Sequence, residues 1–289
     1  MTLGSLAVTG NAKKRAGAGV PLANVTRMPF YGYMGNASCK ACPAAGGERC
    51  CTVDQLDRML SDASSGVDKP AAVVLETVQA EGGVRPASFA WLKQVREVTR
   101  KHDVLMIVDD IQVGCGRTGP FFSFEPAGIE PDIICLSKSL SGYGLPLALT
   151  IFRRDLDVWD PGEHNGTFRG FNHAFVTARA ALEFYWRDDS FRRETEHKAS
   201  LAAERFDEIA HRFGLEHRGR GLIRGLVFAD PAHADAVTHE AFKRGLVIET
   251  AGAKGDVVKL LCPLVIEREQ LLAGIETLEA SIAHVMESA

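Results

Sequence analysis

The chain has 289 residues, of which 46% are apolar and 24% charged, and its net charge is −4. These values are typical of a soluble globular protein with one large or two modest domains, and they exclude disorder, a fibre and a coiled coil as the main architecture. The slight acidity argues against a nucleic-acid partner, and the apolar runs are too short for a membrane span. The odd number of cysteines and the lack of a signal-peptide pattern favour a reduced, cytoplasmic location.

The first half of the chain predicts a sheet flanked by helices. We expect loops in the first 65 residues, with one short helix over 53–63. A helical spacing of apolar residues predicts a helix over 88–102, with Ser88 as its N-cap. Four apolar runs predict buried strands: 71–75, 104–108, 133–136 and 147–152. Because these runs alternate with helices, we expect a mostly parallel sheet covered on both faces, an α/β fold.

The second half predicts a smaller α+β domain. Long helices are expected over 174–186, 190–213 and 267–286. Short strands are expected over 221–228, 245–249 and 257–261. We place the boundary near residue 187, so that a large domain spans 1–187 and a small C-terminal domain spans 188–289.

Polar residues follow three of the predicted strands. They are the loop after Leu75, the pair Asp109–Asp110, and Lys138 within Ser-Lys-Ser-Leu-Ser-Gly. A carboxylate after a strand is often only a helix cap, and a lone lysine there is usually a surface residue. However, functional groups of open α/β sheets gather at the carboxyl ends of the strands. An acid and a lysine at two such ends could therefore meet across one ligand.

Pyridoxal phosphate is a cofactor whose chemistry needs this pair. It forms a Schiff base with a lysine, and its ring nitrogen needs an acidic partner that keeps it protonated. The lysine must lose its proton to react, and burial beside a cationic ring lowers its pKa.

The segments around these residues resemble the class III (ornithine/GABA type) aminotransferases. Ile107-Val-Asp-Asp-Ile-Gln-Val-Gly-Cys-Gly-Arg-Thr-Gly119 is similar to one motif of that family, with Asp110 where glutamate is usual. Pro131-Asp-Ile-Ile-Cys-Leu-Ser-Lys138 resembles the strand that leads to the cofactor lysine. Glu76-Thr-Val-Gln-Ala-Glu-Gly-Gly83 and His164-Asn-Gly-Thr-Phe-Arg-Gly170 resemble two further loops of the family.

The resemblance implies a fold type I pyridoxal phosphate enzyme and a role for each matching residue. Lys138 would carry the cofactor, Asp109 would pair with its ring nitrogen, and Gln112 would contact its 3-oxygen. Thr167 would reach the cofactor phosphate of a neighbouring subunit, which implies a homodimer with shared active sites. Glu81 would be the gate residue that masks or frees an arginine for a substrate carboxylate.

Within the class, the sequence most resembles the diaminobutyrate–2-oxoglutarate aminotransferases of ectoine biosynthesis. This narrower resemblance rests on Ser-Gly-Tyr-Gly-Leu-Pro146, Gly-Glu-His-Asn-Gly-Thr-Phe-Arg-Gly170 and the tail that ends at Leu264. It implies transfer of an amino group from glutamate to aspartate 4-semialdehyde. Two alternatives stay open: another class III substrate (ornithine, acetylornithine or GABA), and an inactive remnant or partner subunit.

The resemblance also begins late in the family's sequence. Family members have roughly another quarter to a third of chain before the point that matches Met1. We therefore expect an N-terminally truncated chain that lacks the loop holding the cofactor phosphate.

Four cysteines fall where the family has a plain loop: Cys39, Cys42, Cys50 and Cys51. Two close cysteine pairs are a possible zinc site. Because adjacent cysteines suit one tetrahedral ion poorly, we favour an insertion without a metal, either inert or redox-active.

Overall fold

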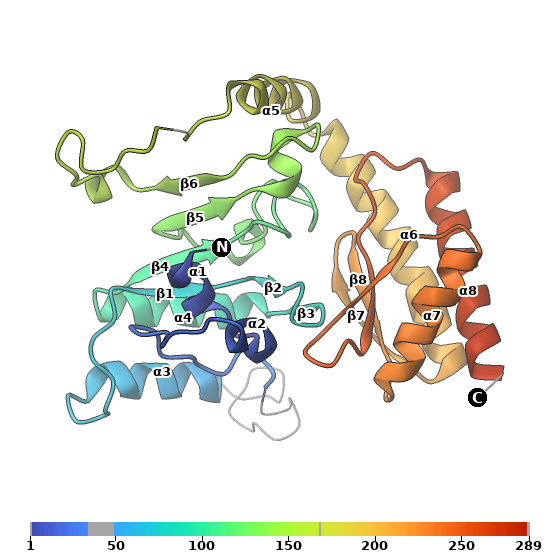
Figure 1. Ribbon diagram of the computed structural model, residues 1–289, viewed down its shortest axis with the longest axis horizontal. Coiled ribbons are helices and arrows are strands. Elements are labelled where there is room, and N and C mark those ends of the chain that lie inside the picture. Colours follow the sequence, from blue (N-terminus) through green and yellow to red (C-terminus); the bar gives the residue numbers. More distant parts are fainter. Residues whose placement is uncertain (1, 34–48, 168, 288–289) are drawn as a thin grey trace.

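The computed structural model describes residues 2–33, 49–167 and 169–287. The chain forms two parts side by side, each with its own four-stranded sheet, as Figure 1 shows. The sheet of the first part has the order β1-β4-β5-β6, and the sheet of the second has the order β7-β8-β10-β9.

The first sheet is mostly parallel. Its strands are β1 (Ala72–Leu75), β4 (Leu105–Asp109), β5 (Ile133–Leu136) and β6 (Leu149–Phe152). The first three run parallel, and β6 runs antiparallel to β5. The short 3₁₀ helices η2 (Glu125–Ala127), η3 (Lys138–Ser141) and η4 (Arg154–Leu156) lie in the connections.

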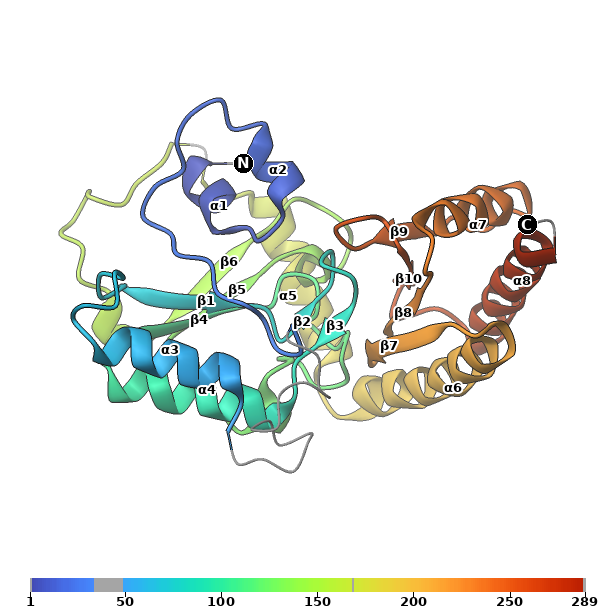
Figure 2. The same cartoon turned by 90° about the horizontal axis from the view of Figure 1, so that it is seen from below.

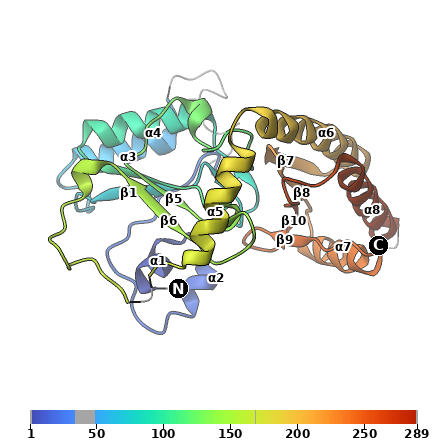
Figure 3. The ribbon, with the colours of Figure 1, turned by 90° about the horizontal axis from the view of Figure 1, so that it is seen from above.

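Two helices cover one face of this sheet. They are α3 (Cys51–Ser61) and α4 (Phe89–Lys101), and Figures 2 and 3 show both on the same side. Met106 and Val108 of β4 are fully buried against Leu92 and Val95 of α4. The short helices α1 (Leu3–Val8) and α2 (Ala12–Ala16) lie on the other side.

That second face is less covered within the described part of the chain. Ile107 is half-buried, and Val74 and Ile151 are more than 40% exposed. Helices thus lie on both sides of the sheet, and the second face is covered less completely than the first among the described residues.

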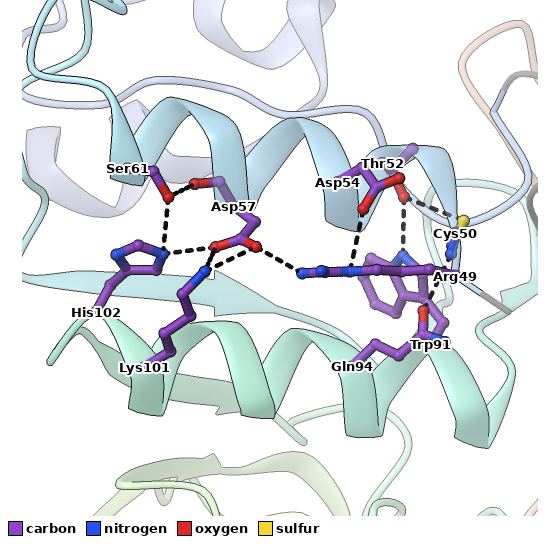
Figure 4. Close-up of polar contacts among 10 residues, drawn as sticks. All are labelled: Arg49, Cys50, Thr52, Asp54, Asp57, Ser61, Trp91, Gln94, Lys101 and His102. Carbon is purple, nitrogen blue, oxygen red and sulfur yellow. Dashed lines mark hydrogen bonds and ion pairs between the residues drawn. The ribbon is translucent and has the colours of Figure 1, made fainter.

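A group of charged contacts, which we call the α3–α4 clamp, joins α3 to α4 (Figure 4). The carboxylate of Asp57 on α3 accepts hydrogen bonds from Lys101 Nζ at 2.9 Å and Arg49 Nη2 at 2.9 Å, and lies 2.6 Å from His102 Nε2. The clamp thus holds the end of α4 against α3.

The second part is an antiparallel sheet packed against helices. Its elements are α6 (Ser190–Phe213), β7 (Glu216–Arg220), β8 (Ile223–Val227), α7 (Pro231–Lys243), β9 (Glu249–Ala251), β10 (Val257–Leu260) and α8 (Arg268–Glu287). Phe206, Leu226, Leu271 and Ile275 are fully buried in its core.

The two parts share a small apolar cluster. In the first part, β2 (Val78–Gln79) and β3 (Arg85–Pro86) form a short hairpin after β1. Val78 and Val113 are buried in one cluster with Ile223 and Val257 of the second sheet. Arg117, also buried, donates from Nη1 to the carbonyl oxygen of Cys262 at 2.5 Å.

The chain crosses between the parts after α5 (Asn172–Tyr185). The domain boundary at 187 stays a prediction.

Candidate active site

Charged side chains follow three neighbouring strands at one edge of the first sheet. Glu76 follows β1, Asp109 ends β4, and Lys138 stands two residues after β5. Asp109 is in register with Cys135 of β5. Because the three strands are parallel, their carboxyl ends share the edge where α/β proteins place functional groups.

Lys138 has an unusual backbone. Its φ is +51°, in the left-handed region, at a cost of about 1–3 kcal/mol for a residue other than glycine. Ser137 fixes the turn by donating from Oγ to the carbonyl oxygen of Leu147 at 2.5 Å. The turn ends at Gly142, where a Cβ would lie 2.3 Å from the Cβ of Ala181 on α5. The close packing of α5 thus holds the turn, and the Lys138 side chain is exposed.

The neighbouring carboxyls Asp109 and Asp110 have different surroundings. Asp109 is half-buried, and its Oδ1 accepts the Ile111 N–H at 3.1 Å. Burial raises the pKa of Asp109, and the Ile111 hydrogen bond and the positive charge of Lys138 oppose that rise. Asp110 is fully buried and accepts the Ser123 N–H at 3.0 Å. Asp109 is therefore the carboxyl coupled to the lysine, and Asp110 holds the strand end in place.

Glu76 is a third carboxyl at this edge; the sequence pointed to the loop after Leu75 but assigned no role to Glu76. It is half-buried, and its Oε1 accepts the Ala80 N–H at 3.5 Å. Burial raises the pKa of Glu76 to about 7, and the negative charge of Asp109 adds to the rise. The sequence did carry a signal, since Glu76 follows its strand directly.

Glu81 and Gln112 contact a lysine of the second part. Lys259 Nζ lies 2.6 Å from Glu81 Oε1, 2.9 Å from Glu249 Oε1 and 3.5 Å from Gln112 Oε1. Gln112 Nε2 donates to Glu81 Oε1 at 3.0 Å. The pKa of Glu81 is lowered: burial acts to raise it, but the bonds from Lys259 and Gln112 and the charge of Lys138 outweigh burial.

The partner of Glu81 differs from the resemblance, which implied an arginine. The side chain of Lys259 is 0% exposed, although it sits in the apolar run at 257–261. We missed Lys259 and Glu249 in the sequence, where a lone charge inside an apolar strand was the available signal.

Thr167 lies apart from these residues. It is exposed, in the connection between η4 and α5, and within the described part of the chain no bond joins it to Lys138, Asp109, Gln112 or Glu81. The structure therefore brings four of the five predicted site residues together through direct bonds or charge coupling.

The four cysteines of the predicted insertion lie away from this edge or outside the described residues. Cys50 is the N-cap residue of α3, and its N–H donates to Gln94 Oε1 at 3.1 Å. Cys39 and Cys42 lie outside the described residues. Elsewhere in the described chain no group of three His, Cys, Asp or Glu residues could hold a metal ion. The preference for an insertion without a metal stays a prediction.

The arrangement combines two chemical functions. An accessible amine, Lys138, lies within the electrostatic reach of Asp109 and Glu76, which suits a group that forms a covalent bond and moves protons. A buried ammonium, Lys259, already holds carboxylate groups through direct ion pairs. The edge can therefore hold a reactive carbonyl compound and a substrate carboxylate together.

Known proteins are similar to this chain over almost its whole length. Residues 1–282 match the sequence profile of the family described as aminotransferase class-III. A diaminobutyrate–2-oxoglutarate transaminase of Bordetella parapertussis is 54% identical over 98% of this chain and 63% of its own length. One of Nocardia farcinica is 51% identical over 98% of this chain and 62% of its own length. The chain thus spans somewhat less than two thirds of these curated relatives.

A solved structure has the same fold. The ornithine aminotransferase of Toxoplasma gondii is 30% identical, with a TM-score of 0.71, over 82% of this chain and 55% of its own. In that protein, pyridoxal phosphate partly occupies the active site.

A membrane span needs a long helix of apolar residues, and no helix in the described part of the chain meets both conditions.

Proposed function

The chain belongs to the class III aminotransferases, and from this membership we propose that the protein exchanges an amino group between two substrates with the help of pyridoxal 5′-phosphate. The reaction converts glutamate and aspartate 4-semialdehyde into 2-oxoglutarate and 2,4-diaminobutyrate. The observation that carries the proposal is the placement of Asp109 and Lys138 at the carboxyl ends of the adjoining parallel strands β4 and β5.

The residues at this edge fit the cofactor. When bound, pyridoxal phosphate supplies a ring that accepts electrons from the substrate. The exposed Lys138 amine would hold it, and the half-buried Asp109 would supply the negative charge that a protonated ring nitrogen requires. Gln112, whose amide lies at the same edge, would hold the ring 3-oxygen.

Two further steps, proton transfer and binding of the substrate carboxylate, would be carried out by side chains of this protein. The Lys138 amine takes up and returns the proton of the substrate carbon, because it is the accessible base at the edge. Glu81 leaves Lys259 when a substrate carboxylate arrives, so that one carboxylate replaces another on the same buried ammonium. This exchange extends the gate role expected of Glu81, with a lysine in the place of the arginine.

The choice of substrate rests on the relatives. Curated proteins about 50% identical over nearly the whole chain bear the name diaminobutyrate–2-oxoglutarate transaminase. This favours diaminobutyrate over ornithine, acetylornithine or GABA, and it favours an enzyme over an inactive remnant. We propose a place in ectoine biosynthesis from the narrower resemblance of the motifs, and a cytoplasmic location from the odd number of cysteines.

We also propose a homodimer with shared active sites. Apolar side chains are exposed along β6, the connection that follows it and α5: Leu149, Ile151, Val158, Val176 and Phe184. A second copy that covers this surface would exclude it from water. The exposed Thr167 would then reach the cofactor phosphate of that copy.

Cofactor loading tests the proposal. We expect an absorbance band near the visible edge, which borohydride removes while it leaves a modified peptide that contains Lys138. Lys138→Ala should abolish the band and the formation of glutamate from diaminobutyrate and 2-oxoglutarate, whereas Lys93→Ala, at an exposed lysine of α4, should change neither. Modification of another lysine would contradict the assignment.

A further inference from the structure

Lys259 has two carboxylate partners, and the proposed gate needs only one. The ammonium is completely buried, while the side chains of Glu81 and Glu249 are 64% and 61% exposed. Burying a charge is costly unless it is paired. A single carboxylate with the amide oxygen of Gln112 would already pair Lys259, so the second carboxylate needs its own explanation.

The two partners are attached to Lys259 in different ways. Glu249 stands directly opposite Lys259 in the antiparallel pair of β9 and β10, so both residues belong to one sheet. Glu81 comes from the hairpin of the other part, 178 residues away in the chain. Glu249 therefore moves with Lys259, and Glu81 is the partner that can be exchanged.

The group has an excess of negative charge. Lys259 contributes one positive charge, and Glu81 and Glu249 contribute two negative charges. If a substrate carboxylate only replaces Glu81, the excess remains beside Glu249. If the substrate also carries an ammonium next to its carboxylate, that ammonium cancels the charge of Glu249. Glu249 pairs with Lys259 through its Oε1 atom, and among the described residues its Oε2 atom makes no hydrogen bond or ion pair, so Oε2 can accept such a group.

We propose that Glu249 determines substrate specificity by binding the ammonium of a zwitterionic amino-acid end, while Lys259 binds its carboxylate. This inference rests on the proposed function and deepens it. The reacting amine of 2,4-diaminobutyrate is at carbon 4, so its 2-ammonium and carboxylate form such an end. The compound 4-aminobutyrate has the same carbon chain and reacting amine but lacks the 2-ammonium.

Glu249 then favours one of the two amines. It attracts diaminobutyrate through a charge-assisted hydrogen bond. It gives no such bond to 4-aminobutyrate, whose carboxylate only replaces that of Glu81 on Lys259 and brings no positive charge to Glu249. The preference disappears when the charge at position 249 is removed.

The test compares the two amines in the wild type and in Glu249→Gln. We expect the wild-type ratio of kcat/KM for diaminobutyrate over 4-aminobutyrate to fall roughly 10- to 100-fold in the variant, the size of one charged hydrogen bond. Glu216→Gln is a matched control, because Glu216 is also a strand glutamate with a 61% exposed side chain, but its partner is Arg218. The control should leave the ratio unchanged.

A binding measurement separates this inference from the proposed function. Calorimetric titration of the cofactor-free protein with each amine gives a ratio of Kd values that requires no turnover. If the ratio favours diaminobutyrate in the wild type and collapses in Glu249→Gln, the inference stands even where no transamination occurs. Suppose instead that diaminobutyrate is transaminated, but that Glu249→Gln leaves the kcat/KM ratio and the Kd ratio of the two amines unchanged, even if the rates for both amines fall equally. The inference is then wrong and the proposed function stands.

Discussion

Two carboxylate clusters of the first part have opposite electrostatics. In the α3–α4 clamp, the hydrogen bond from His102, followed by that from Lys101, holds the pKa of Asp57 well below its usual range. At the strand edge, burial instead raises the pKa of Glu76 and of Asp109. The clamp surrounds one carboxylate with three basic side chains, whereas the edge places Glu76 and Asp109 beside a single lysine. A cluster that stabilises the fold satisfies its charges, and a cluster prepared for a ligand leaves them incompletely paired.

Removing the charge of Asp109 tests the edge most strongly. In the holoenzyme, Asp109→Asn keeps the shape of the side chain but removes its negative charge. We expect the transamination rate to fall on the order of 10²- to 10³-fold, because a preorganised charge is lost, while the stability of the fold changes little. Asp110→Asn is the control, since Asp110 is buried against Ser123 and its loss should lower stability. A nearly normal rate in Asp109→Asn would show that this residue only caps the strand.

The second largest effect should be the change of folding stability with pH that the raised pKa of Glu76 causes. Its pKa of about 7 lies above the ordinary value of 4.5, so the folded protein binds more protons than the unfolded protein between these values. Stability from this group is therefore complete below pH 4.5 and is lost as the pH rises to about 7, by about 3 kcal/mol. Denaturant unfolding at several pH values should show this slope in the wild type and a flatter curve in Glu76→Gln. Parallel curves would refute the assignment.

The clamp should show a smaller effect of opposite sign. Because the pKa of Asp57 is lowered in the folded state, its contribution is present above the ordinary value of 3.8 and is lost as the pH falls below it. We expect Asp57→Asn to lower the free energy of unfolding at pH 7 by about 1–2 kcal/mol, with no change in transamination rate. Asp54→Asn, which loses only one contact to Arg49, is the comparison variant and should cost less. Equal losses would mean that the clamp contributes nothing beyond a surface ion pair.

The sequence predicted much of the fold where periodicity was strong. The helix expected over 190–213 has those bounds in the structure, and the strand expected over 133–136 also agrees. Helix α7 was missed because Ala234 and Ala241 form much of its buried face, and small residues give a weak apolar period. Strand β7 was missed because its sequence, Glu-His-Arg-Gly-Arg, lacks apolar alternation. The helices α1 and α2 were missed because each has fewer than two turns, too few for a helical spacing of apolar residues to be recognised.

The candidate site was predictable only for residues that directly follow a predicted strand. Asp109 and Lys138 follow apolar runs, so their shared edge could be expected from the parallel sheet. The pairing of Glu81 with Lys259 joins positions 178 residues apart, and it depends on how the second sheet packs against the hairpin. Local spacing contains no information about that packing. Whether these residues perform the roles assigned to them stays a prediction.

The left-handed backbone of Lys138 has a consequence for engineering the protein. Glycine is the residue that adopts a φ of +51° without penalty, so the residue that folds best at this position differs from the lysine to which we assign the bond with the cofactor. Stability and reactivity are therefore in direct conflict at one residue. Selection for thermal tolerance alone would favour variants that replace this lysine, and any programme to stabilise the protein has to hold position 138 constant.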